Sequence, residues 1–100
     1  MKLQKFRWSK VYESQEEELV NLLRAKGVTA KRSHANEFHD FGERTYSQNS
    51  TIWCAEGSFK ITTANLTFSM QPGDGITIPA DTTLAITAGM SGCAFYEATR

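Results

Sequence analysis

The sequence has no excess charge of either sign and no long hydrophobic run. Its 11 lysine and arginine residues balance 11 aspartate and glutamate residues, so the formal net charge is zero. Non-specific nucleic-acid binding depends mainly on positive charge, and we therefore expect no nucleic-acid partner. No apolar stretch approaches the roughly 20 residues that cross a bilayer as a helix. We therefore expect no contact with a membrane either.

Cysteine is scarce, and the start of the chain lacks the features of a secretory signal. Cys54 and Cys93 each lie in an apolar, strand-like run, where free cysteine usually packs as a small hydrophobe. A disulfide between them stays open, because it requires close and well aligned Cβ atoms. The basic residues within 1–7 precede no apolar segment, which argues against a leader peptide. We expect a cytoplasmic protein with reduced thiols.

One segment near the start has the features of a helix. Ser14 and Glu17 have the spacing of a capping box, and Gly27 supplies a left-handed stop. Between them, leucine and valine residues share one face. This pattern predicts a helix over about residues 15–26, which packs against a sheet.

Most of the remaining chain predicts short strands separated by turns. One strand is expected over Ser50–Glu56 and another over Ser58–Thr63, with Gly57 breaking the run between them. A hairpin turn is expected at Ala64–Asn65, and Gly89–Gly92 is expected to separate the last two strands. Many short strands at such spacing are typical of a sandwich or barrel.

Two stretches resemble the conserved motifs of the cupin superfamily. Residues 53–61 contain Glu56-Gly57 at a strand end, and residues 70–83 contain Pro72-Gly73-Asp74 followed by Pro79. The chain is also similar to small single-domain bacterial cupins. The resemblance implies one mostly β domain over residues 1–100: an RmlC-like barrel (a double-stranded β-helix or jelly roll) over about residues 29–98, with one N-terminal helix.

The resemblance also implies where a metal site would be. Cupins typically hold a divalent metal through a His-x-His pair, a glutamate and a later histidine. These positions correspond here to Arg44 and Tyr46, to Ser50 and to Leu84. A shift by one residue would place Glu43 and Thr45 at the first pair, which does not restore the site. None of the four residues is a good metal ligand, so we expect neither a metal nor another cofactor.

The same positions are candidates for binding a small molecule. If they keep the register of the usual ligands, Arg44, Tyr46 and Ser50 face the barrel interior, where a guanidinium can hold a carboxylate or phosphate. The alternative is that Arg44 lies in a loop and points to water. The predicted ligand-binding residues are Arg44, Tyr46, Ser50, Ile52, Cys54, Leu84 and Ile86.

Other reactive residues favour structural interpretations. His34 and His39 could join Glu37 in a metal site if their segment bends over the barrel, but their odd spacing favours opposite faces of a strand. Cys54 could be a nucleophile, although apolar surroundings would make its thiol inert. Trp8 and Trp53 could stack on a flat ligand, whereas filling a core or a dimer contact is the commoner role.

The sequence therefore favours a non-catalytic module that binds or senses a small molecule. One alternative is a cupin enzyme of the isomerase or dioxygenase type, with atypical metal ligands. Another is a purely structural interaction module with a filled barrel. We also expect a homodimer, in which the segment from Lys5 to Tyr12 pairs with the partner's sheet and covers an edge strand.

Overall fold

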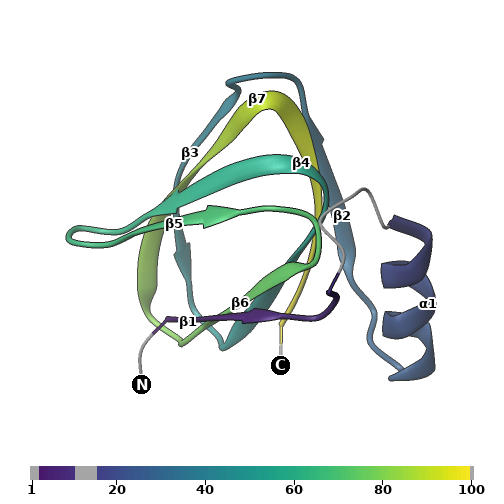
Figure 1. The fold of residues 1–100 in the computed structure, drawn as a ribbon. Helices are drawn as coiled ribbons and strands as arrows, with labels where there is room; N and C mark the ends of the chain where they lie inside the picture. The colour runs from purple at the N-terminus through teal and green to yellow at the C-terminus, as the bar shows by residue number, and fades with distance from the viewer. Residues whose placement is uncertain (1–2, 11–15, 100) are drawn as a thin grey trace.

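A computed structural model describes residues 3–10 and 16–99 (Figure 1). Seven strands and one helix make up this part of the chain. In chain order they are β1 (Gln4–Arg7), α1 (Glu16–Ala25), β2 (Lys31–Ala35), β3 (Asp40–Tyr46), β4 (Ser50–Thr62), β5 (Thr67–Met70), β6 (Asp74–Ile78) and β7 (Thr82–Thr99).

Two long strands, β4 and β7, connect the two halves of a barrel (Figure 1). The first half of β4 lies between β6 and the end of β7, and β1 and β2 extend that half on either side. The second half of β4 lies between β5 and the start of β7, which also pairs with β3. All these pairings are antiparallel, and they confirm the mostly β, barrel-like fold.

The predicted breaks at Gly57 and at Gly89–Gly92 are wrong, because both strands continue through these points. β4 passes Gly57 with bulges on either side of it. Gly57 and Gly92 have φ angles of +66° and +74°, and a Cβ on Gly57 would lie 2.1 Å from the carbonyl oxygen of Gly92. Glycine serves here to bend two paired strands at a corner of the barrel, whereas the sequence pattern suggested a turn.

The barrel interior is filled by apolar side chains from both halves. Phe59 and Phe95 lie at its centre with ring centroids 4.9 Å apart, and Phe41 packs edge-on against Phe95. Burying each large side chain contributes about 1.5–3 kcal/mol. The other members of this cluster are Ala35, Ile52, Cys54, Ile61, Met70, Ile76, Ile78, Leu84, Ile86, Ala88 and Cys93.

The helix covers the outer face of β4 and lies outside the barrel beside β2 (Figure 1). Its buried residues Leu19 and Leu23 pack with Ala55. After the helix, the amide of Val28 donates to the carbonyl of Leu23, and Gly27 has a φ of +69°. The stop at Gly27 is confirmed. Ser14 and residue 15 lie outside the described residues, so the capping box is not seen.

Strand β1 pairs with β6 of its own chain, with Phe6 opposite Gly75. β1 uses one of its two edges for this pairing and is the end strand of the sheet order, so pairing of Lys5 to Tyr12 with a partner's sheet stays a prediction; Tyr12 lies outside the described residues. The pairing with β6 is close, because a Cβ on Gly75 would lie 2.3 Å from the ring of Phe6. The homodimer itself stays a prediction.

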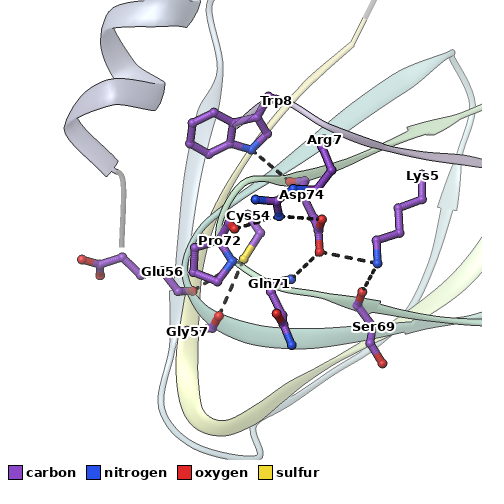
Figure 2. Close-up of polar contacts among 10 residues, drawn as sticks. All are labelled: Lys5, Arg7, Trp8, Cys54, Glu56, Gly57, Ser69, Gln71, Pro72 and Asp74. Carbon is purple, nitrogen blue, oxygen red and sulfur yellow. Dashed lines mark hydrogen bonds and ion pairs between the residues drawn. The ribbon is translucent and has the colours of Figure 1, made fainter. Parts of the chain in front are cut away.

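A buried carboxylate attaches β1 to the turn before β6 (Figure 2). Asp74 accepts a hydrogen bond from Arg7 Nη1 at 2.8 Å and another from the backbone amide of Gln71 at 2.9 Å. Lys5 Nζ lies 3.5 Å from the second carboxylate oxygen, and the Trp8 indole donates to the Asp74 carbonyl. The Pro-Gly-Asp motif thus stabilises the fold through long-range contacts.

Within the described residues, no helix is both long enough and apolar enough to pass through a lipid bilayer.

Candidate functional site

The structure brings the predicted polar residues together at one end of the barrel. Arg44 and Tyr46 lie on β3, where Arg44 is opposite the buried Leu84. Directly opposed residues share one face of an antiparallel sheet, so Arg44 is on the interior side. Ser50 begins β4 and is buried. The alternative that Arg44 lies in a loop is therefore wrong.

A three-residue cluster forms around the Arg44 guanidinium. Arg44 Nη1 donates to both carboxylate oxygens of Glu97, at 3.0 and 3.2 Å, and to the Tyr46 hydroxyl at 3.2 Å. The Tyr46 hydroxyl in turn donates to Glu97 Oε2 at 3.0 Å. Glu97 lies on β7 directly opposite Ile52, which is in the core. This carboxylate was not predicted from the sequence, although its alternation with Phe95 in the last strand places both on one face.

The protonation states in this cluster follow from its surroundings. Burial raises the pKa of Tyr46 to about 12, so the phenol stays neutral and donates a hydrogen bond to Glu97. Burial alone would lower the pKa of Arg44, but hydrogen bonds to Tyr46 and Glu97 raise it above its ordinary value. At neutral pH the cluster is therefore a cation, a carboxylate and a neutral hydroxyl.

Three of the five N–H groups of the Arg44 guanidinium have no partner among the described residues. Every polar contact of its side chain within the described chain passes through Nη1. Nε and Nη2 form the other donor fork of a guanidinium, and such a fork matches the two oxygens of a carboxylate. The Arg44 side chain is 31% exposed, so solvent reaches it.

A pocket of about 390 Å³ lies beside this cluster, at the barrel mouth. Tyr46, Ser50 and Glu97 contribute to its wall, and the end of β2 adds Lys31, which lies opposite Glu97 in the strand pairing. The Ser50 hydroxyl donates to the Gln48 carbonyl at 3.1 Å. The other residues of the wall are Thr29, Ala30, Ala98 and Thr99. We call this space the mouth pocket.

The four apolar residues predicted to line a ligand pocket lie in the core instead. Ile52, Cys54, Leu84 and Ile86 are at most 1% exposed, and none of them contributes to the wall of the mouth pocket. They are covered because Phe59, Phe95 and their neighbours fill the barrel between the two halves. A ligand at the mouth would therefore meet mainly polar groups and the ends of strands.

The two cysteines are buried free thiols. Burial raises the pKa of Cys54 far above its ordinary value, and burial also raises the pKa of Cys93 to about 11. The Cys54 thiol donates to the backbone carbonyls of Glu56 and Gly57, at 3.8 and 3.9 Å (Figure 2). These thiols are therefore poor nucleophiles at neutral pH.

The residues at the usual cupin metal positions do not fit a metal ion. Arg44 is a cation, Tyr46 is a neutral phenol and Leu84 has no donor atom, while Glu97 is already bonded to Arg44 and Tyr46. The positive charge of Arg44 repels a divalent cation, and the other residues provide no free anionic or imidazole ligand for it. Among residues 3–10 and 16–99, no three His, Cys, Asp or Glu side chains are grouped in a way that could hold a metal.

The remaining predicted candidates lie outside this cluster. His34 is on β2 opposite Ala94 and is exposed, and His39 is exposed just before β3, so they do not meet at the barrel interior. Trp8 and Trp53 pack with α1 and Ala55 in the second apolar cluster. The interpretation of the tryptophans as packing residues is confirmed.

Comparison with known proteins shows similarity at the level of structure only. No family model matches the chain, and no curated protein matches it by sequence. The structure is similar to a DUF861 family protein from Thermotoga maritima, with 16% identity, a TM-score of 0.64, and coverage of 99% of this chain and 100% of that chain. It is also similar to a cupin superfamily protein from Desulfitobacterium hafniense, with 13% identity, a TM-score of 0.67, and coverage of 98% and 76%.

A third similar structure is a salicylate 1,2-dioxygenase from Pseudaminobacter salicylatoxidans. It has 12% identity and a TM-score of 0.59, and the match covers 92% of this chain but 37% of that enzyme. At such low sequence identities, structural similarity indicates a shared fold and does not indicate a shared activity. Together with the strand order and the two motifs, these likenesses show that the chain has the cupin fold.

Proposed function

We propose that this protein is a non-catalytic module that binds a small anionic molecule, such as a carboxylate, at the mouth pocket. The single observation that carries the proposal is the partly used guanidinium of Arg44. Glu97 and Tyr46 hold Nη1, while the Nε and Nη2 fork has no partner within the described chain. A guanidinium held in this way loses little entropy when it binds a planar anion.

The charges around the mouth pocket support an anionic ligand. Lys31 is a cation in the wall of the mouth pocket, and Arg44 is a second cation, bonded to the wall residues Tyr46 and Glu97. Glu97 is the one carboxylate among these residues, so the local balance is positive. Lys31 has no polar partner among the described residues and is exposed. A small carboxylate would bind the Arg44 fork, and the Lys31 ammonium would add attraction at longer range.

The chemistry of the cluster supports binding rather than catalysis. The Tyr46 phenol keeps its proton because its pKa is raised to about 12. Glu97 accepts hydrogen bonds from Arg44 and Tyr46, so its carboxylate oxygens are already engaged within the cluster. The enzyme alternative would need ligands such as His34 and His39, which do not reach the barrel interior.

The structural alternative is favoured by one observation, which is the filled barrel. Ile52, Cys54, Leu84 and Ile86 occupy the space that a ligand would need deeper inside. If the mouth pocket binds nothing, a stable barrel that serves only as an interaction module is the remaining function.

Titration with acetate, succinate and benzoate, followed by the chemical shifts of backbone amides, tests the proposal. We expect saturable shifts at residues near Tyr46 and Glu97 for at least one of the three. Arg44→Lys keeps the positive charge but removes the fork, and it should weaken binding by about tenfold or more. Arg24→Ala, an exposed arginine on α1, is the matched control and should leave binding unchanged.

Two results would contradict the proposal. The first is no saturable shift with any of the three anions, which would favour the structural module. The second is equal affinity in wild type and Arg44→Lys, which would remove Arg44 from the site. Urea unfolding of each variant checks that the fold is retained.

A further inference from the structure

The outer face of the barrel carries an apolar patch that is separate from the mouth pocket. Three large hydrophobic side chains are exposed in the described chain: Phe38 at 66%, Leu66 at 51% and Met90 at 75%. Phe38 and Met90 both line one pocket of about 410 Å³, which shares no residue with the mouth pocket. Single exposed hydrophobic residues are ordinary, but two beside one pocket indicate a binding surface.

Strand register places part of the wall of this pocket on the outside of the barrel. Lys60 is opposite Ser69 on β5 and opposite Thr87 on β7, and all three are exposed and line the pocket. Ile61, the neighbour of Lys60 on β4, points the other way, into the core. We call this space the outer pocket. Its remaining lining residues are Ser58, Phe59, Met70, Gln71, Ala88 and Gly89.

The backbone holds the pocket open and keeps the Phe38 ring at its edge. Gly89 has no side chain, and a Cβ there would lie 2.1 Å from the Ser58 hydroxyl. The Phe38 amide donates to the Gly89 carbonyl at 3.0 Å, which attaches the β2–β3 connection to β7. Phe38 has a φ of 56°, a conformation that costs a non-glycine residue about 1–2 kcal/mol. The fold thus maintains an exposed aromatic ring where local preference would not place it.

The charge of the outer pocket indicates the sign of its ligand. Among the described residues that line it, Lys60 alone carries a charge, and no carboxylate in that part of the chain pairs with it. Ser58, Ser69 and Gln71 add hydrogen-bonding groups beside Phe38 and Met90. Pockets of about 300–1,000 Å³ that combine apolar walls with a few polar groups are typical of small-molecule sites.

We infer that the outer pocket binds a small amphipathic anion, with an aromatic or short aliphatic body against Phe38 and Met90 and one acidic group at Lys60. We expect a small molecule as the occupant, because Lys60 is the single charged residue beside the apolar side chains. A protein partner would more often meet several charged residues around such an apolar area. The inference does not depend on the mouth pocket, since no side chain is common to the two.

Fluorescence titration with anilinonaphthalene sulfonate, an aromatic anion, tests the inference, and octanoate serves as a competitor. We expect one site per chain and displacement by octanoate. Phe38→Ser and Met90→Ser should each weaken binding by about tenfold, because each removes apolar contact area. Leu66→Ser removes an exposed hydrophobic residue that does not line the pocket, and it should have no effect.

A second variant separates charge from apolar contact. Lys60→Met keeps an apolar stem and removes the ammonium, so it should weaken binding of the sulfonate by several-fold. The same variant should leave the affinity for uncharged phenylnaphthylamine unchanged. Urea unfolding curves that match wild type confirm that the dye reports on a folded barrel.

Three outcomes would overturn the inference. One is an equal loss of dye binding in Leu66→Ser and Phe38→Ser, which would show non-specific adhesion to apolar surface. Another is failure of octanoate to displace the dye. The third is a concentration-dependent dimer in sedimentation equilibrium that dissociates in Phe38→Ser and excludes the dye, which would assign the patch to a second copy of the chain.

Discussion

Replacing Asp74 with alanine should destabilise the barrel. The carboxylate is 4% exposed and holds the β1 strand, the turn at Gln71 and the start of β6 together (Figure 2). Its removal leaves the Arg7 guanidinium and the Gln71 amide without this acceptor. The loss therefore falls on the long-range contact with Arg7 and on the local turn at Gln71.

The magnitude can be worked from the three contacts. The hydrogen bond from the Gln71 amide at 2.9 Å reaches a buried charged acceptor, and such a bond contributes about 1.5–2 kcal/mol. The ion pairs with Arg7 and Lys5 involve side chains that are 28% and 40% exposed, so solvent screening reduces them to about 1 kcal/mol together. We expect Asp74→Ala to lower the free energy of unfolding by about 2–3 kcal/mol.

Urea unfolding followed by tryptophan fluorescence measures this loss, and the melting temperature should fall by roughly 10–20 °C. Asp74→Asn keeps one acceptor oxygen, so its loss should be intermediate. Glu43→Ala removes an exposed carboxylate from β3 and should change stability by less than about 0.5 kcal/mol. A loss in Asp74→Ala as small as that of Glu43→Ala would refute the assignment of Asp74 as the residue that holds β1.

Two further predictions concern the helix and the barrel corner. Hydrogen bonds from Arg32 and then Tyr96 lower the pKa of Glu16 below its ordinary value of 4.5, so the contribution of Glu16 to stability is present above pH 4.5 and is lost as pH falls through the folded pKa. The difference in unfolding free energy between wild type and Glu16→Gln should therefore shrink on acidification. A difference that stays constant with pH would contradict this. Gly57→Ala places a Cβ 2.1 Å from a backbone oxygen, and it should prevent folding or lower the free energy of unfolding by about 3 kcal/mol or more in urea. Gly42→Ala, with a similar φ and nothing within 4 Å of the added Cβ, should lower it by about 1–2 kcal/mol. Equal losses would show that the corner is not tightly packed.

Local patterns in the sequence predicted much of the fold. The alternation of Ile52 and Cys54 with Trp53 correctly separates the barrel core from the face that α1 covers. The two glycine corners were misread because glycine marks both a turn and a bulge, and the local sequence is similar for each. Continuation of β4 and β7 through these corners depends on pairing with each other, which lies outside any local window.

The polar cluster was predictable in part. Register placed Arg44 and Tyr46 at the barrel interior, but Glu97 is 53 residues from Arg44 and no local pattern joins them. The apolar residues that were expected to line a pocket lie in the core, because Phe59 and Phe95, from β4 and β7, fill the barrel interior beside them. Whether an inward-facing position is wall or core depends on the side chains opposite it.

The sequence by itself determined the class of fold and the absence of good metal ligands at four positions, because period-two alternation, turn residues and residue identity are local properties. Only the tertiary structure determined that Glu97 binds Nη1 of Arg44, that Asp74 holds β1, and that Phe38 and Met90 line one pocket. Each of these contacts joins segments far apart in the chain, and strand register, which is set by the packing of the whole barrel, places them together.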